Sequence, residues 1–145
     1  RSLWILSGRP IVSALFKNAE SHPDKLSVTI GTEPNVLRVS YRELSEKIRK
    51  VAALFLEKGV KQDDCIILSA SQSPSFVYAY FATHLIGATA VPVDPQVSST
   101  QLNFIAHATY ARMAFLSKYV TVKGVSDVAL IDSLLGLGNE PLNQF

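Results

Sequence analysis

The chain has 145 residues, which is the size of one ordinary domain and enough to bury a substantial core. Its 14 Lys and Arg and 12 Asp and Glu give a formal net charge of +2, which is too weak to support a nucleic-acid partner. No apolar stretch approaches the ~20 residues that cross a bilayer, and one cysteine excludes an intrachain disulfide, so we expect a cytoplasmic protein without a transmembrane segment.

Hydrophobic residues make up 48% of the sequence, and the mean hydropathy of +0.20 is high for a free-standing soluble domain. Two interpretations remain open at this point. Either the chain contains a sheet that is buried on both faces, or part of its apolar surface is covered by a partner or by another part of the same protein. A homodimer is one form of the second interpretation.

A helix and a β-hairpin are predicted in the first 40 residues. Apolar residues recur at helical spacing over 10–21, and Pro10 suits the first turn of a helix. Two short runs, 26–31 and 36–39, flank the turn-forming residues 33–35, and this pattern predicts a pair of strands.

The best-marked helix is predicted to begin after Ser40. Ser40 and Glu43 form a capping-box pattern, in which the Ser40 side chain caps the backbone and Glu43 reaches back. An apolar stripe at helical spacing follows, and Gly59 is placed to end the helix in a left-handed conformation.

Beyond this helix, strands and helices alternate. The run Cys65–Ala70 is apolar on both faces, which is typical of an interior parallel strand. Short connections between strand, helix and strand require parallel strands with right-handed crossovers. The sequence therefore predicts an α/β fold, with a doubly wound, mostly parallel sheet, helices on both faces and a small N-terminal hairpin. A helix is predicted over 74–86, with Ser73 as its cap and Gly87 at its end, and another over 98–108, where Ser98 and Gln101 form a second capping-box pattern. Strands are predicted over 89–93, 113–116 and 128–131.

In sheets of this kind, ligands bind beyond the carboxyl ends of the strands. Here that edge comprises Ser69–Ser73, Asp94–Gln96 and Ser117–Tyr119, which supply hydroxyls, one carboxylate and one lysine. Asp94 stands at a strand end, but an aspartate before proline most often caps its own turn. Pro92 lies inside a predicted strand, where proline is tolerated only if its missing N–H faces no partner strand.

No catalytic residue and no metal site is predicted in this chain. Neither common Gly-rich phosphate loop is present in the sequence. His22, His84 and His107 each lack a second ligand at metal-binding spacing, and Cys65 has no basic neighbour that would activate its thiol.

Two motifs taken together indicate a family. VSYREL at Val39–Leu44 and LIGATAVPVDP at Leu85–Pro95 resemble the first two core motifs of the AMP-forming adenylating enzymes. These enzymes are acyl- and aryl-CoA synthetases, luciferases and peptide-synthetase adenylation domains. The order and spacing of the motifs make the resemblance specific, and it covers roughly residues 10–117. The matching residues, for which we expect a structural role, are Ser40, Tyr41, Glu43, Leu44, Gly87, Pro92, Asp94 and Pro95.

The resemblance implies a ligase that joins a carboxylic acid to AMP, using ATP and Mg²⁺, and then transfers the acyl group to a thiol such as CoA. The family's phosphate loop, adenine-binding segment, ribose-binding aspartate and catalytic lysine would all follow Phe145. We therefore expect residues 1–145 to be a single N-terminal α/β domain of a larger ligase, with poorly structured ends over 1–9 and 136–145. By itself this domain would bind no cofactor and be inactive, and its partner would be the remainder of the same polypeptide.

The chain also departs from the family pattern at individual positions. Asp63 stands where the family usually has a turn glycine, a position that aspartate tolerates. Gln96 replaces an arginine with which some CoA ligases meet CoA phosphate. Lys118 and Lys123 follow a strand end where some CoA ligases place basic residues near the CoA nucleotide, so these two lysines are the candidates for a CoA-phosphate contact.

The alternative function is a stand-alone α/β binding, signalling or scaffold module without catalytic activity. A receiver-like domain would need paired acids at a strand end, and this chain offers only Asp94 there. A flavodoxin-like domain would need a phosphate loop, for which SASQS at residues 69–73 is the one candidate.

Overall fold

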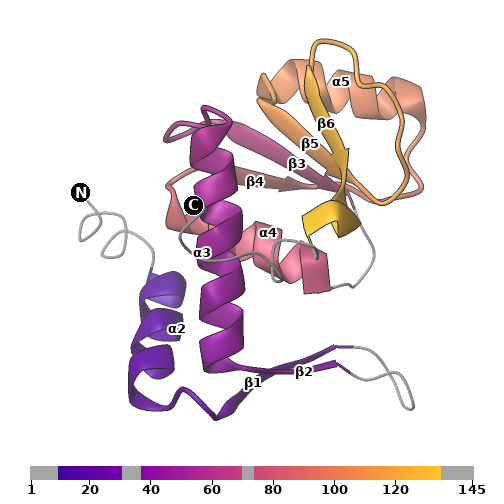
Figure 1. Cartoon of the computed structure of the whole chain (residues 1–145). Helices are drawn as coiled ribbons and strands as arrows, with labels where there is room; N and C mark the ends of the chain where they lie inside the picture. Colours follow the sequence, from indigo (N-terminus) through magenta and orange to yellow (C-terminus); the bar gives the residue numbers. More distant parts are fainter. Residues whose placement is uncertain (1–9, 31–36, 70–73, 135–145) are drawn as a thin grey trace.

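The computed structural model describes residues 10–30, 37–69 and 74–134. Its centre is a four-stranded sheet in the order β4-β3-β5-β6 (Figure 1). All three neighbouring strand pairs are parallel, as the alternation of strands and helices predicted. The strands are β3 (Cys65–Ser69), β4 (Thr89–Pro92), β5 (Met113–Leu116) and β6 (Asp127–Leu130).

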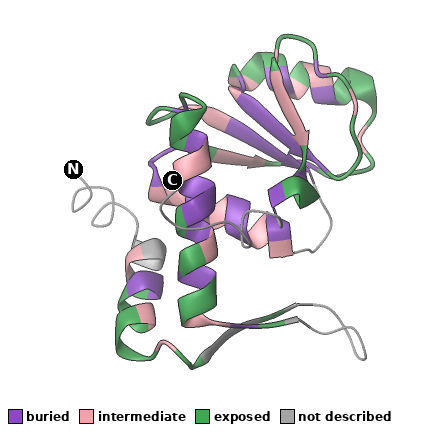
Figure 2. Ribbon diagram, viewed as in Figure 1, coloured by how far each residue is buried: buried purple, intermediate pink, exposed green. Residues whose placement is uncertain are grey.

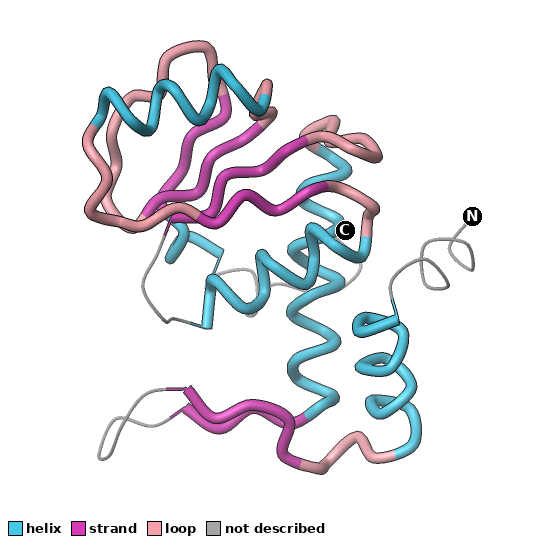
Figure 3. Tube along the Cα trace, turned by 180° about the vertical axis from the view of Figure 1, so that it is seen from behind, coloured by secondary structure: helices cyan, strands magenta, loops and turns pink. Residues whose placement is uncertain are grey.

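Helices cover both faces of this sheet, which confirms the doubly wound arrangement (Figures 1 and 3). Helices α3 (Tyr41–Glu57) and α4 (Pro74–Leu85) lie on one face, and α5 (Ser99–Thr109) lies on the other. Alternate strand residues enter the two cores: Ile66, Leu68 and Phe115 pack with α3 and α4, whereas Ile67, Ala114 and Leu116 pack with α5. The apolar character of the sequence is thus explained in part by the central strands β3 and β5, which are buried on both faces, whereas the edge strands β4 and β6 are partly exposed (Figure 2).

The N-terminal elements lie beside this sheet rather than in it. Helix α2 (Pro10–Ser21) packs against α3, and strands β1 (Leu26–Ile30) and β2 (Leu37–Ser40) form a separate antiparallel pair. The predicted hairpin is therefore confirmed, although its turn lies outside the described residues. The amide of Tyr41 donates to the carbonyl of Lys25 at 3.0 Å and so fixes the start of α3 to the hairpin.

Helix α3 begins at the cap that its sequence predicted, and of the two bonds of the predicted capping box the structure shows the one to the Ser40 hydroxyl. Ser40 is the N-cap, and its hydroxyl accepts a hydrogen bond from the Glu43 amide at 3.2 Å. The apolar stripe faces the core, where Leu44, Ile48 and Phe55 are at most 1% exposed. The Phe55 ring also lies 5.4 Å from the ring of Phe115 on β5, centroid to centroid. This contact joins the longest helix directly to the sheet.

Five described residues have a left-handed backbone, namely Gly59, Asp63, Gly87, Tyr110 and Gly124, and the sequence had marked the first three. Gly59 has φ 85° after α3 and Gly87 has φ 79° after α4. Asp63 has φ 68°, which confirms that this position has the left-handed backbone conformation that glycine usually occupies. The Asp63 amide donates to the Gly87 carbonyl at 3.0 Å, so the two turns hold each other at the amino end of β3 and β4.

Pro92 occupies the sheet edge in the only orientation that a proline permits. Among the described residues, strand β4 is an edge strand that pairs with β3 alone. The amides of Thr89 and Val93 donate to β3 or to the turn before it, at 2.8 and 3.0 Å. Because backbone groups alternate along a strand, the nitrogen of Pro92 faces the open edge, where no N–H is needed.

Element boundaries differ from the predictions by about one residue. Helix α4 ends at Leu85 rather than at 86, α5 spans 99–109 rather than 98–108, and β6 begins at Asp127 rather than at 128. Strand β4 ends at Pro92, one residue earlier than predicted, although the Val93 amide still donates to the Leu68 carbonyl on β3 at 3.0 Å. Residues 1–9 and 136–145, predicted to be poorly structured, lie outside the described residues, as do Ala70 at the end of a predicted strand and the predicted cap Ser73.

Candidate functional site

The candidate site is a pocket at the carboxyl ends of β3 and β5. Strand β3 is the first of the parallel sheet, and the chain places β4 on one side of it and β5 on the other. The strand order therefore reverses between β3 and β5, and ligands of open α/β sheets bind at such a switch point. The Ser117 amide donates to the Ser69 carbonyl at 2.7 Å and joins the two strand ends beneath the pocket.

The pocket encloses about 190 Å³ between the two strand ends and the start of α5. Ser69, Ser99, Ser117 and Lys118 supply its polar groups, three hydroxyls and one ammonium. Of these, Ser69 is 5% exposed, whereas Ser117 and Lys118 are exposed. The remaining lining residues are Pro95, Val97, Leu102, Leu116 and Val120. This volume lies below the ~300–1,000 Å³ of a drug-sized ligand site, so the pocket fits a small polar group rather than a whole nucleotide.

The first turn of α5 holds one wall of this pocket in place. Ser98 and Gln101 form the reciprocal capping box that the sequence predicted: the Gln101 amide donates to Ser98 Oγ, and the Ser98 amide donates to Gln101 Oε1, both at 3.1 Å. Ser99 and Leu102 lie in this fixed turn and line the pocket. The sequence identified the cap but not this wall, because the wall depends on how α5 packs against the sheet.

Asp94, the carboxylate at the predicted edge, is used locally. Its Oδ1 accepts a hydrogen bond from the Gln96 amide at 2.8 Å, and its carbonyl accepts one from the Val97 amide at 3.1 Å. Asp94 thus caps its own turn, as expected for an aspartate before proline. It does not line the pocket, whereas its neighbour Pro95 does.

The two candidate lysines differ in position. Lys118 lines the pocket, directly after the end of β5. Lys123 is not among the lining residues, and its amide donates to Asn103 Oδ1 on α5 at 2.9 Å. The structure therefore brings Lys118, but not Lys123, to the switch point.

The matching residues of the two motifs are distributed over the scaffold. Ser40, Tyr41, Glu43 and Leu44 start α3 beside the hairpin, away from α5 (Figure 1). Gly87 turns the chain between α4 and β4, and a Cβ there would lie 3.3 Å from Gln62 Cγ. Pro95 is the one matching residue that lines the pocket.

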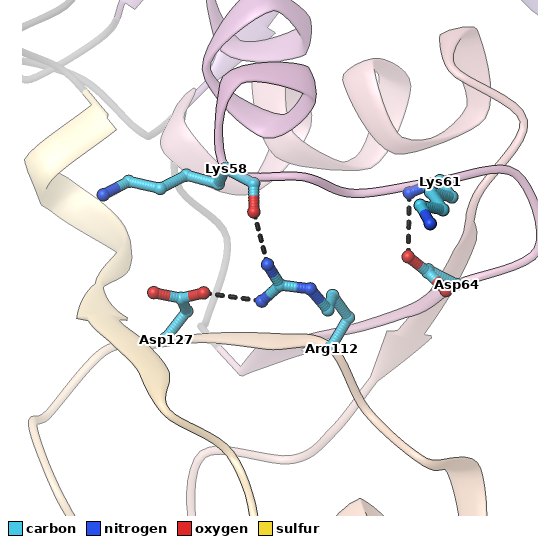
Figure 4. Close-up of polar contacts among 5 residues, drawn as sticks. All are labelled: Lys58, Lys61, Asp64, Arg112 and Asp127. Atoms are coloured by element: carbon cyan, nitrogen blue, oxygen red, sulfur yellow. Dashed lines mark hydrogen bonds and ion pairs between the residues drawn. The ribbon is translucent and has the colours of Figure 1, made fainter.

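A polar cluster that the sequence did not reveal centres on Arg112, just before β5 (Figure 4). Its Nη1 donates to Asp127 Oδ2 on β6 at 2.6 Å, and its Nη2 donates to the Lys58 carbonyl at the end of α3. The Arg112 amide also donates to the Cys65 carbonyl on β3 at 2.8 Å. One residue thus joins four elements at the amino end of the sheet, opposite the pocket. No local sequence pattern marks such a contact, because its partners lie far apart in the chain.

The remaining sequence candidates show no catalytic arrangement. Desolvation by burial, together with the neighbouring Asp64 carboxylate, raises the pKa of the Cys65 thiol, which opposes activation. His84 lies against Tyr80 and His107 against Tyr110, at ring-centroid distances of 4.6 and 6.4 Å. Within residues 10–30, 37–69 and 74–134, no group of three His, Cys, Asp or Glu could hold a metal ion. In the same ranges, no helix is long and apolar enough to cross a membrane.

Comparison with known proteins finds relatives by sequence and by fold. Tyrocidine synthase 3 of Brevibacillus parabrevis is 30% identical over 118 residues, which cover 81% of this chain but 2% of the synthase. The 4-coumarate–CoA ligase CCL1 of Humulus lupulus is 30% identical over 128 residues, which cover 86% of this chain and 22% of the ligase. The Klebsiella oxytoca NpsA N-terminal subdomain has the same fold, with a TM-score of 0.72 at 19% identity over 90% of this chain and 34% of that chain.

The chain therefore spans only a small part of the length of the curated relatives that it matches. The model of the family described as AMP-binding enzyme matches residues 15–141, which is most of the sequence and includes both motifs. This extent of match shows that the chain belongs to the AMP-binding enzyme family.

Proposed function

We propose that this chain is the N-terminal part of an AMP-forming ligase that activates a carboxylic acid and passes its acyl group to a thiol. The observation that carries the proposal is the family match over residues 15–141. In the proposed reaction, a carboxylate oxygen attacks the α-phosphorus of ATP and pyrophosphate leaves. The thiolate sulfur then attacks the acyl carbon, and AMP leaves.

In the step that activates the acid with ATP, the contribution of this chain is structural. The pocket of about 190 Å³ is too small for ATP, and within the described residues no three His, Cys, Asp or Glu side chains gather as a metal site. The sequence contains no Gly-rich loop that would cradle phosphates. ATP and Mg²⁺ would therefore be held by other segments of the ligase, and this chain would supply the sheet against which those segments fold.

Calorimetric titration of the 145-residue chain with ATP and Mg²⁺ tests whether other segments of the ligase are needed to bind them. We expect no binding heat and no acid-dependent exchange of pyrophosphate into ATP. A polypeptide that carries this chain followed by the remaining ligase segments is expected to catalyse the exchange with at least one carboxylic acid. Micromolar ATP affinity of the chain alone would contradict the need for those segments, and failure of the longer polypeptide with every acid would favour the stand-alone module.

Within the ligase, Lys118 is the residue that we assign to the thiol donor. Lys118 lines the switch-point pocket together with Ser99 and Ser117, and an ammonium with serine hydroxyls is a combination that suits a phosphate oxygen. The start of α5 forms the opposite wall, and its backbone amides favour negative charge there. A CoA phosphate, or the phosphate of a carrier-bound phosphopantetheine, supplies that charge.

Steady-state kinetics of the longer polypeptide separate this role from a structural one. We expect Lys118→Ala to raise the KM for CoA about tenfold, which corresponds to ~1.4 kcal/mol, while the KM for ATP stays unchanged. Lys118→Arg should retain most of the affinity because it keeps the charge. Lys123→Ala is the matched control, since Lys123 does not line the pocket. Equal effects of the two alanine variants, or a parallel change in the KM for ATP, would contradict the assignment.

A further inference from the structure

The outer surface of α5 carries an exposed aromatic side chain beside an apolar groove. Phe104 is 73% exposed, although phenylalanine is among the residues most often buried. The groove next to it has a volume of about 490 Å³ and a mainly apolar lining. Its lining residues are Val97, Thr100, Gln101, Phe104 and Ile105. Phe104 thus projects from the surface, and it also lines a groove into which an apolar side chain fits.

Charge is absent from this surface. Helix α5 has the sequence STQLNFIAHAT, which contains no Asp, Glu, Lys or Arg. A surface that recognises a different, charged partner would carry complementary charges, whereas two identical surfaces with net charge would repel each other. An uncharged surface can meet its own copy without that repulsion.

We propose that this α5 surface, defined by the five groove residues, binds a second copy of the chain across a twofold axis. A twofold interface must be self-complementary, so that a projecting group and its receptor lie on the same surface. The α5 surface meets this requirement, because Phe104 and the groove lie on one helix. In the dimer, the two Phe104 rings meet near the twofold axis, and each contacts the groove edge that the other ring forms.

The position of Phe104 along α5 fixes how the two helices pair. It is the middle residue of the 11-residue helix, so a twofold axis passing near it pairs two antiparallel α5 helices over their whole length of ~16 Å. Position 100 of one helix then faces position 108 of the other. Tyr110, 87% exposed, follows the helix and lies near the start of the partner's α5. A single helix pair buries less than a standard interface, so we expect a concentration-dependent dimer rather than a permanent one.

Sedimentation velocity over a wide range of chain concentrations tests the proposal. We expect the wild-type chain to shift from monomer to dimer as its concentration rises, and Phe104→Glu to remain monomeric because it places a carboxylate at the twofold axis. Leu56→Glu is the matched control, since Leu56 is 56% exposed and lies on α3. A wild-type chain that stays monomeric, a dimer that survives Phe104→Glu, or an equal loss in Leu56→Glu would overturn the proposal.

Disulfide cross-linking tests the pairing of the helices independently. In a Cys65→Ser background, Thr100→Cys and Ala108→Cys chains are oxidised separately and as a mixture. Both positions are exposed, and they lie at equal distances on either side of Phe104. We expect the mixture to form cross-linked dimers of unlike chains in marked excess over the separate samples, and Phe104→Glu to abolish them. Equally efficient cross-linking of the separate chains would overturn the twofold arrangement.

Discussion

Asp63 adopts a backbone conformation that side chains other than glycine rarely take. Its φ of 68° lies in the left-handed region, where a Cβ crowds the following carbonyl. Aspartate and asparagine tolerate this region better than alanine does, because their short polar side chains form local hydrogen bonds. The turn also positions the Asp63 amide for its bond to Gly87. The residue type at position 63 is therefore set by the backbone rather than by a ligand.

The effect of a substitution at Asp63 on the free energy of unfolding should depend on how well the new residue tolerates a left-handed backbone. We expect Asp63→Ala to lower the free energy of unfolding by about 1 kcal/mol, because alanine accepts the left-handed conformation only with strain. Asp63→Asn should leave it nearly unchanged, and Asp63→Gly should change it little, since the strain relieved is offset by about 0.5–1 kcal/mol of backbone entropy. Urea unfolding of the three variants gives the comparison. A loss in Asp63→Asn as large as that in Asp63→Ala would show that the carboxylate itself, rather than the turn, is responsible.

At the scale of elements, the Arg112 side chain joins α3 to β6 across the end of β5. Its ion pair with Asp127 is half-buried, with side-chain exposures of 34% and 32%. The second bond, to the Lys58 carbonyl, satisfies a backbone acceptor at the end of a helix. A Cβ on Gly59 would approach Arg112 Nη2 to 3.3 Å, so the glycine that ends α3 also leaves room for the arginine.

Arg112→Ala is expected to lower the free energy of unfolding by about 1–2 kcal/mol, because it leaves Asp127 and the Lys58 carbonyl without their donor. Arg42→Ala is the control, since the Arg42–Asp24 pair is longer, at 3.4 Å, and far more exposed, at 56% and 83%. We expect its loss to stay below about 0.5 kcal/mol. A double-mutant cycle of Arg112→Ala with Asp127→Ala, measured in urea, isolates the pair. Equal losses in Arg112→Ala and Arg42→Ala would contradict the linking role.

The elements themselves were predictable because their signals are local. The Ser40 cap, the reciprocal Ser98–Gln101 cap and the left-handed Gly59 each act within a single turn of helix. Apolar runs as short as Met113–Leu116 were enough to identify strands that are buried on both faces. Boundaries were predicted less accurately, because the last residue of an element depends on its packing partner.

At the scale of the whole molecule, sequence reasoning located the sheet edge at which a ligand is expected, but not the pocket there. The edge follows from topology, since parallel strands place their carboxyl ends together. The pocket requires in addition that Ser99 and Leu102 on α5 approach Lys118, and that packing has no signature in the sequence. The hydrogen bond between Ser75 Oγ and Asp132 Oδ1, 57 residues apart, was unpredictable for the same reason.

Pro92 makes the two edges of the sheet unequal in the backbone N–H donors that they offer to a further strand. Along β4 the groups that face away from β3 belong to Ala90 and Pro92, so this edge offers one N–H donor where an ordinary four-residue strand offers two. The opposite edge, β6, contains no proline. A further strand from any source therefore finds a complete row of donors beside β6 and an interrupted one beside β4. Pro92 therefore makes the β4 edge the less favourable one for a further strand, which reduces the number of ways in which a longer chain can misassemble on this sheet.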